Sequence, residues 1–124
     1  MCGRFTLTAE AKELAKRFGV EISASFYRNI VANYNIAPTQ SVIVVGNDGK
    51  RYVTQMRWGL VPSWAKDPAT GNRMINARAE TLTIKPAFRV ALQKRRCIVV
   101  ADGFYEWQKR GGKAAGDRSC PTGR

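Results

Sequence analysis

The first twenty residues show the apolar spacing of an amphipathic helix. Its apolar positions fall at i, i+3, i+4 and i+7, namely Ala11, Leu14, Ala15 and Phe18. Thr8 is placed to act as the N-cap, and Gly19 stands where a glycine commonly follows the last helical turn;. We therefore expect a helix over residues 9–18, preceded by a short strand over residues 3–6.

The middle of the chain carries the pattern of a β-hairpin. Ser41–Val45 is rich in β-branched residues, Asn47–Gly49 has the composition of a turn, and Tyr52–Trp58 is a second strand candidate;. Between the helix and this hairpin, residues 20–34 carry few periodic signals and predict a loop or a short irregular segment. Residues 33–40 are expected to be extended and turn-like, because a proline disfavours helix at the residue before it.

Residues 74–81 alternate between polar and apolar side chains. As a strand, the segment divides into two faces, with Asn76, Arg78 and Glu80 on one and Ile75, Ala77 and Ala79 on the other;. A face of amide, guanidinium and carboxylate groups is poor core material, so it is either exposed to solvent or part of a polar site. The preceding residues 67–72 have a loop composition;.

A basic helix is expected over residues 85–96. Phe88 and Leu92 face inward in this interpretation, and Val90 is a further candidate for the inward face;.

The stretch Trp58–Trp64 leaves the predicted hairpin through a glycine and a proline. Its tryptophans therefore suit either the core or a surface platform for stacking;.

Two strands are expected near the end of the pattern. Residues 97–101 predict a buried strand in which Cys97 is a small core residue;. Residues 104–107 predict another strand, in which Glu106 lies among three aromatic residues. Burial there would raise the pKa of the Glu106 carboxyl group and suit it to general-acid work. Strand alternation alone is equally consistent with a glutamate that points to water.

Composition changes the picture through charge. The 124 residues carry 21 Lys and Arg against 9 Asp and Glu, a net charge of +12, which favours a polyanionic partner;. A membrane surface is not expected, since no apolar run can span a bilayer and no helix pairs a strongly apolar face with a lysine-rich one. Nucleic acid remains, with a merely solvated basic surface as the alternative.

The cysteines and the missing histidines exclude several kinds of site. The three cysteines, Cys2, Cys97 and Cys120, are too far apart for a zinc knuckle or a CxxC redox pair;. Without histidine, His-based triads and the common zinc-hydrolase sites are excluded;. We expect no metal and no cofactor. Residues 1–20 show no secretory leader, so we expect a cytoplasmic protein with reduced thiols.

Cys2 directly follows the initiator Met1. Removal of Met1 would give Cys2 a free α-amine beside its thiol, and an α-amine titrates near neutral pH. Such a 1,2-aminothiol condenses with an aldehyde to a Schiff base, which the thiol then closes into a five-membered ring. The amine can also act as the base for its own thiol. The alternative is that a small residue here only favours methionine removal and its thiol is buried.

Six motifs occur in one order along the chain: MCGRF, NIAPTQ, MRWGLVPSWAKD, MINARAET, KPAFR and CIVVADGFYEW. Together they resemble the SOS response-associated peptidase (SRAP) family over residues 1–108, and they outweigh the alternative explanation of Cys2. The resemblance implies an α+β fold with an antiparallel, barrel-like β-sheet core and peripheral helices. It also implies recognition of abasic sites in single-stranded DNA during the DNA damage response, and hence association with the bacterial nucleoid.

The resemblance further implies a covalent chemistry. In this family the exposed N-terminal cysteine forms a thiazolidine with the ring-opened abasic sugar, and the DNA–protein crosslink shields the lesion. By motif, Cys2 matches the nucleophile, Asn76 the residue that positions it, and Glu106 the catalytic glutamate that transfers protons. The DNA-binding candidates are Arg4 and Arg78 for phosphates, Trp64 for base stacking, Lys85 and Arg89 for an extended phosphate track, and Tyr34 and Asn35 at the pocket border;.

The chain also departs from the family pattern. Members are usually nearly twice as long, and their second half supplies further strands and an active-site histidine. We therefore expect residues 1–108 to be the N-terminal portion of an SRAP-like domain, incomplete by length, and residues 109–124 to be a basic tail that is disordered or foreign to the fold;. Steps that need the histidine, such as crosslink reversal or lyase turnover, are in doubt, and the oligomeric state stays open.

Three other functions remain to be distinguished. A non-covalent module for single-stranded DNA would use charge and tryptophans alone, and its binding would be salt-sensitive and indifferent to Cys2. A cysteine autopeptidase would act mainly on its own N-terminus, although no histidine is present to activate the thiol;. A truncated, non-functional remnant would lack a cooperative unfolding transition.

Overall fold

The computed structural model describes residues 3–106, 109–110 and 113–114. In chain order, the elements are β1 Phe5–Leu7, α1 Ala11–Phe18, α2 Ala24–Tyr27, β2 Asn33–Ile36, β3 Ser41–Asn47, β4 Arg51–Arg57, the 3-10 helices η1 Pro68–Arg73 and η2 Ala79–Thr81, α3 Pro86–Lys94, β5 Ile98–Val99, β6 Gly103–Phe104, β7 Lys109–Arg110 and β8 Lys113–Ala114. The expected α+β fold is confirmed.

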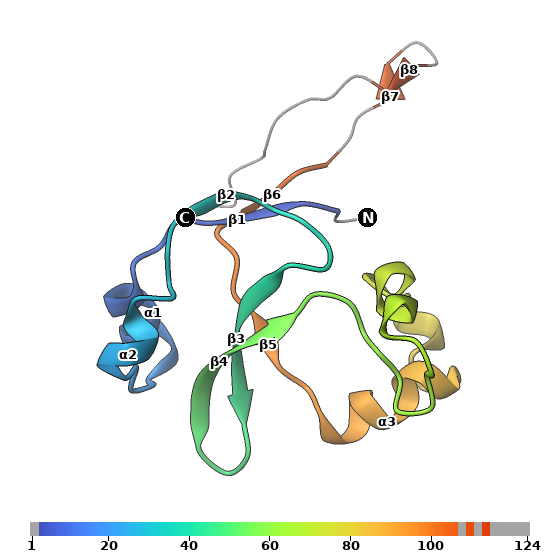
Figure 1. The fold of residues 1–124 in the computed structure, drawn as a ribbon, viewed down its shortest axis with the longest axis horizontal. Coiled ribbons are helices and arrows are strands. Elements are labelled where there is room, and N and C mark those ends of the chain that lie inside the picture. Colours follow the sequence, from blue (N-terminus) through green and yellow to red (C-terminus); the bar gives the residue numbers. More distant parts are fainter. Residues whose placement is uncertain (1–2, 107–108, 111–112, 115–124) are drawn as a thin grey trace.

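All strand pairs are antiparallel, as expected. One three-stranded sheet has the order β2-β1-β6, a second has the order β4-β3-β5, and β7 pairs with β8. The chain passes from the second sheet to the first between β5 and β6. Figure 1 shows α1 and α2 on one side of the β3–β4 hairpin and α3 on the other. Among the described residues, the sheets do not join into a closed barrel.

The predicted hairpin is confirmed and supplies the centre of the core. β3 pairs with β4 along its whole length, from Ser41 with Arg57 to Asn47 with Arg51. Five consecutive residues of β3 are buried, which is the pattern of a strand covered on both faces;. The core cluster consists of Phe5, Leu7, Leu14, Val20, Ile36, Val42, Ile43, Val44, Val45 and Val100.

The predicted first helix is confirmed, but not its predicted N-cap. Gly19 follows the helix with φ 60°, in the left-handed region that glycine adopts without strain;. Glu10 occupies the N-cap position and makes no side-chain capping bond. Thr8 donates both its backbone amide and its hydroxyl to Asp102 instead. Thr8 is therefore held by a distant carboxylate before the helix begins, and it does not cap the helix.

The segment expected to be a loop contains a short helix and a strand. Ser23 caps α2 by accepting a hydrogen bond from the amide of Phe26 at 3.3 Å. β2 then begins at Asn33 and pairs with β1. The stretch after it turns as predicted, and its φ of 76° at Thr39 marks the turn before β3.

The predicted strand over residues 74–81 is wrong. Residues 74–78 lie between η1 and η2, residues 79–81 form η2, and both the supposed polar and apolar faces of the segment are largely exposed. Its backbone bonds run to the loop that follows β4, where the amide of Leu60 donates to the carbonyl of Met74 at 3.1 Å. Because Gly59 has φ 131° and a Cβ there would lie 2.5 Å from the carbonyl oxygen of Gly71, the two loops can pack this closely only through glycine.

The prediction for the later elements is partly right. α3 forms with Phe88 and Leu92 half-buried, but Val90 is exposed. The buried strand over residues 97–101 is wrong, since β5 has only two residues and Cys97 is exposed. Val100 alone is buried there, and its amide donates to the carbonyl of Ile43 at 3.0 Å.

The strand expected over residues 104–107 begins earlier and is shorter. β6 covers Gly103–Phe104, and Tyr105 and Glu106 follow it outside a strand. Trp107 lies outside the described residues. Of the predicted tail, the described residues form β7 and β8, which pair with each other.

Candidate functional site

The beginning of β1 is held from two sides. The amide of Tyr105 donates to the carbonyl of Arg4 at 2.9 Å, and β6 pairs Phe104 with Phe5. On the other side, Nη1 of Arg4 donates to Oδ1 of Asn35 in β2 at 2.9 Å. The sequence suggested Asn35 only as a pocket border, and the structure makes it a direct partner of Arg4.

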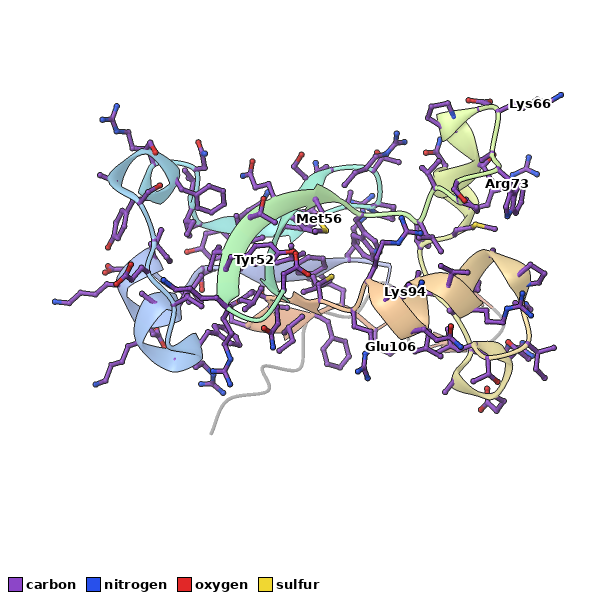
Figure 2. The ribbon with its side chains drawn as sticks, turned by 90° about the horizontal axis from the view of Figure 1, so that it is seen from below. Tyr52, Met56, Lys66, Arg73, Lys94 and Glu106 are labelled. Atoms are coloured by element: carbon purple, nitrogen blue, oxygen red, sulfur yellow. The ribbon has the colours of Figure 1, made fainter. Side chains whose placement is uncertain are left out.

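The segment after β6 is fixed to β2 as well. The Tyr105 hydroxyl donates to the carbonyl of Tyr34 at 2.7 Å. Glu106, the next residue, therefore follows a residue anchored at both its backbone and its side chain. Glu106 is exposed, so the expected enclosure among aromatic side chains is wrong and the alternative of a water-facing glutamate is the one observed (Figure 2).

A second series of contacts leads from β1 to Asn76. The rings of Phe5 and Trp58 lie 5.1 Å apart at 55°, a tilted arrangement that aromatic pairs favour;. Nε1 of Trp58 then donates to the carbonyl of Ile75 at 3.0 Å. Asn76 is the following residue and is exposed. Trp58, one of the two tryptophans for which the sequence allowed either a core or a surface position, is thus half-buried and bonded to the residue before Asn76.

Three of the predicted site residues thus gather around the start of β1. Arg4 lies in that segment, Glu106 follows the residue bonded to Arg4, and Asn76 follows the residue bonded to the ring that packs on Phe5. Cys2, the predicted nucleophile, lies outside the described residues, two positions before Arg4.

The remaining predicted DNA contacts lie elsewhere. Trp64 is 63% exposed in the loop after β4, as expected for a surface stacking platform. Arg78 is exposed just before η2, Lys85 is the N-cap residue of α3, and Arg89 lies exposed on that helix. All four belong to residues 58–94, which Figure 1 shows beside the hairpin on the side of α3.

Asp102 lies directly before β6 and was not among the predicted site residues. Its Oδ1 accepts the Thr6 hydroxyl at 2.6 Å, and its Oδ2 accepts the Thr8 hydroxyl at 2.8 Å, the Ala9 amide at 3.0 Å and the Thr8 amide. Burial raises the pKa of Asp102, but these hydrogen bonds from Thr6, Thr8 and Ala9 outweigh it and hold the pKa below its ordinary value of 3.8;. The carboxylate therefore fixes the end of β1 to the start of β6.

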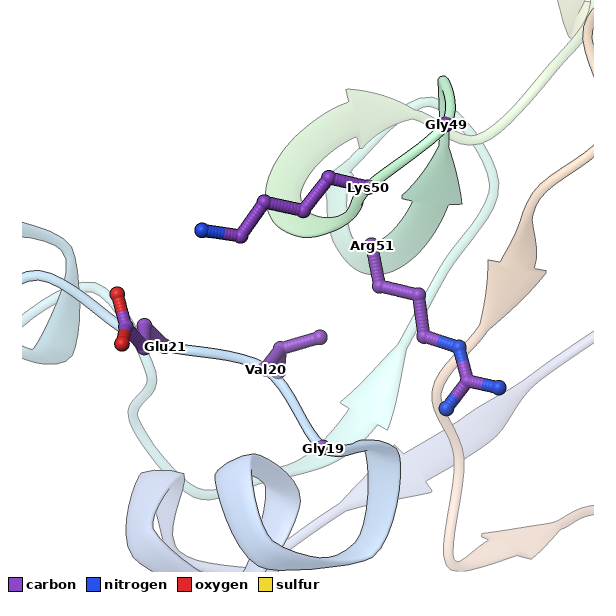
Figure 3. Close-up of a pocket in the computed structure, with 6 residues that line it drawn as sticks. All are labelled: Gly19, Val20, Glu21, Gly49, Lys50 and Arg51. Atoms are coloured by element: carbon purple, nitrogen blue, oxygen red, sulfur yellow. The ribbon is translucent and has the colours of Figure 1, made fainter.

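A cavity of about 500 Å³ lies away from these residues (Figure 3). Its lining comes from the end of α1 and the tip of the hairpin: Gly19, Val20, Glu21, Gly49, Lys50 and Arg51. Nη1 of Arg51 donates to the carbonyl of Phe18 at 2.9 Å, so this arginine ties the hairpin to the helix. The lining mixes one carboxylate with two cations and gives no single charge preference.

The described residues hold neither a metal site nor a membrane-spanning helix. No group of three His, Cys, Asp or Glu side chains among the residues the structure describes is arranged to hold a metal ion. In the same part of the chain, each helix is too short or too polar to cross a bilayer.

Comparison with known proteins adds a family and named relatives. The family model described as SOS response associated peptidase (SRAP) matches residues 1–118. "Abasic site processing protein YoqW" of Bacillus subtilis is 46% identical over 112 residues, which cover 88% of this chain and 49% of that protein. "Abasic site processing protein HMCES" of Gallus gallus is 47% identical over 70 residues, which cover 53% of this chain and 21% of that protein.

A solved structure shares the fold. The crystal structure of a protein from Bacteroides thetaiotaomicron matches with a TM-score of 0.77 and 27% identity, over 91% of this chain and 51% of that one. The chain thus spans about half the length of the bacterial relatives it matches. The order of its motifs, its fold and the family match over nearly its whole length agree, and the chain belongs to the SOS response associated peptidase (SRAP) family.

Proposed function

We propose that this chain recognises abasic sites in single-stranded DNA and captures them covalently through Cys2 after removal of Met1. The observation that carries the proposal is the 46% identity to a protein named for abasic site processing, over a match that covers 88% of this chain. Because the chain spans only half of that relative, the activity is proposed for these 124 residues and is not taken over from the longer protein.

The proposed reaction proceeds in two steps that release one water. The α-amine of Cys2 attacks the C1′ aldehyde of the ring-opened sugar, and loss of water gives a Schiff base. The thiolate then adds to the imine carbon and a proton goes to the nitrogen, which closes a thiazolidine. Both new bonds are to the former aldehyde carbon, and no oxidant, metal or cofactor takes part.

The proposed roles of Glu106 and Asn76 follow from their positions. Glu106 is exposed beside a backbone segment bonded to Arg4, so its carboxyl group can exchange protons with solvent and with a sugar held there;. Asn76 is an amide that can both donate and accept, and the Trp58–Ile75 hydrogen bond supports it from behind;. We propose that Glu106 opens the sugar and assists loss of water, and that Asn76 orients Cys2.

The proposed DNA path leads from this site toward α3. Arg4 is half-buried and fixed by Asn35, which suits it to hold a phosphate beside the lesion;. Arg78, Lys85 and Arg89 are exposed cations that can follow the backbone further along;. An exposed tryptophan such as Trp64 binds a base by stacking without regard to its identity;.

Intact-mass spectrometry tests the proposal directly. The purified chain is incubated with single-stranded DNA that carries one abasic site. We expect a starting mass without methionine, and then a gain of one DNA strand less one water. Retained methionine, or salt-sensitive binding with no gain in mass, would overturn the covalent reaction and leave a non-covalent DNA-binding module.

The chain offers a matched control for this experiment. Cys2→Ser should abolish the adduct, whereas Cys97→Ser should leave its yield unchanged, because Cys97 is an exposed thiol without a neighbouring α-amine. Equal loss in the two variants would indicate ordinary thiol alkylation. A cleaved N-terminal peptide beyond Met1, dependent on Cys2, would favour the autopeptidase.

A further inference from the structure

The sheet β4-β3-β5 has one apolar face whose members can be identified from the register. Val42 of β3 pairs with Met56 of β4, and Val44 pairs with Val99 of β5. Paired residues lie on the same face of a sheet, and so do residues two apart along a strand. Met56, Tyr52 and Val99 therefore share one face with Val42 and Val44, and we name it the β4–β5 face.

Exposure on this face rises from its centre to its edges. Val44 is 1% exposed, whereas Tyr52 is 37%, Met56 42% and Val99 48% exposed. Tyr52 lies over the central strand, since a Cβ on Gly46 would come within 2.4 Å of its Cζ. Figure 2 shows Tyr52 and Met56 along the same outer strand. The described residues therefore bury the centre of this face and leave the flanking strands β4 and β5 partly exposed.

The neighbouring edge strand is open as well. β5 pairs with β3 on one side, and no other described strand pairs with its far side. Ile98, whose side chain belongs to the opposite face from Val99, is 56% exposed. Exposed apolar edges are templates for pairing with a further strand, and natural proteins usually cover them.

The relatives indicate what covers this surface. The chain spans 49% of YoqW and 51% of the Bacteroides protein, whose matching part has the same fold with a TM-score of 0.77. Each of these proteins therefore has a further part of similar length outside the match, which we call its second half. Covering the exposed apolar side chains of this face beside an unpaired strand would remove them from water and gain free energy.

We propose that the β4–β5 face and the free side of β5 form the docking surface for a polypeptide equivalent to that second half, and that they accept it even as a separate chain. The docked polypeptide adds a strand beside Ile98 and Val99 and places apolar side chains over Tyr52 and Met56. This proposal does not depend on the DNA chemistry, because no candidate catalytic residue lies on the surface.

Co-expression tests the proposal. The 124-residue chain is produced together with a tagged polypeptide that spans the unmatched half of YoqW, and the purified product is examined by sedimentation velocity. We expect a complex of one copy of each. Met56→Lys should weaken it by about tenfold or more, since a lysine would lose water on an apolar face.

The neighbouring position gives a matched control. Gln55→Lys introduces the same charge one residue away, on the opposite face of the same exposed strand, and should leave the complex unchanged. Circular dichroism tests whether both variants unfold cooperatively. If Met56→Lys does not fold, hydrogen exchange of the unmodified complex is measured instead of the binding of this variant. The amides of Ile98 and Val99 should then gain at least tenfold protection.

Several results would overturn the proposal. These are failure to recover the second half with the unmodified chain, equal weakening by Gln55→Lys and Met56→Lys, or no gain in protection at β5. If the chain self-associates on its own and Met56→Lys abolishes that association, a second copy of the chain occupies the surface instead.

Discussion

Two regions of this molecule are stabilised in different ways. The first contains β1 to β4 with α1, and its residues are held by strand register, a continuous apolar core and a shared carboxylate. The second contains residues 58–94, where the 3-10 helices and α3 are joined by loops and no residue of these helices other than Gly71 is buried. The predicted chemistry lies at the border of the first region, and most predicted DNA contacts lie in the second.

This difference matches what each task requires. A nucleophile and a proton donor must be held in one geometry, so they belong beside a rigid sheet. Phosphate contacts and base stacking tolerate movement, because they recognise charge and a flat ring. Variants that disturb the first region should therefore change stability and reaction together, and variants of exposed cations in the second should change DNA affinity with little effect on stability.

The largest effect is expected at the centre of the first region. Val44→Asp places a carboxylate at a position that is 1% exposed, without a partner, and should destabilise the fold by more than about 4 kcal/mol;. Urea unfolding measures it. Gln55→Asp, on the exposed neighbouring strand, should cost below about 1 kcal/mol. Similar losses for both would mean that β3 is not the centre of the core.

A second test compares two aspartates that each accept hydrogen bonds from backbone amides, Asp102 beside the first region and Asp67 in the second. Asp102→Ala removes four hydrogen bonds to an ionised group and should destabilise by about 1–3 kcal/mol;. Asp67→Ala removes one capping bond, from the amide of Ala69 at 2.8 Å, and should cost about 1 kcal/mol or less;. Both are measured by thermal or urea unfolding. A larger loss at Asp67 would reverse the ranking of the two regions.

The sequence predicts the first region well for a physical reason. Helix periodicity and the β-branched runs around a turn are local signals, and the residues that carry them are also those that fill the core. Gly19 marks the helix end because its left-handed φ is a local requirement. What the sequence missed here is Asp102, because its partners Thr6 and Thr8 are more than ninety positions away.

The second region was predicted poorly for the complementary reason. Alternation over residues 74–81 predicts a strand only if a partner strand is available, and the segment instead bonds to the loop after β4. Val90, and Cys97 just after this region, look like core residues by type, but no described element covers them. Motifs located Arg4, Asn76 and Glu106, whereas only the fold shows how Trp58 and Tyr105 support them.

The pH dependence of stability sharpens the role of Asp102. Its pKa is lower in the folded chain than its ordinary 3.8, so its contribution is complete above that value and is lost as pH falls through the folded pKa;. The difference in unfolding free energy between the unmodified chain and Asp102→Asn should be constant from about pH 7 to 5 and shrink below about pH 3.8. A difference that grows on acidification would contradict this assignment.

Trp58 connects the two regions and allows a smaller, more specific test. Trp58→Phe keeps a ring against Phe5 but removes the hydrogen bond to Ile75, at an expected cost of about 1 kcal/mol;. Hydrogen exchange should become faster at Met74 to Asn76, and the proposed crosslink should form more slowly. Trp64→Phe is the control for the exchange measurement, and it should leave exchange at Met74 to Asn76 unchanged. Unchanged exchange in Trp58→Phe would show that the Trp58 hydrogen bond does not hold the segment of Asn76 against β1.

The smallest change in stability is expected on α3. Lys85→Ala and Arg89→Ala alter exposed side chains and should shift the unfolding free energy by less than about 0.5 kcal/mol;. Each should weaken binding to single-stranded DNA and reduce the slope of log affinity against log salt by about 0.7, the value for one phosphate contact. Lys12→Ala removes an exposed cation from α1 and should leave that slope unchanged, as fluorescence anisotropy at several salt concentrations would show. An equal loss of slope at Lys12 would mean that the DNA responds to the net charge of the whole chain, and the assignment of DNA contacts to the second region would then fail.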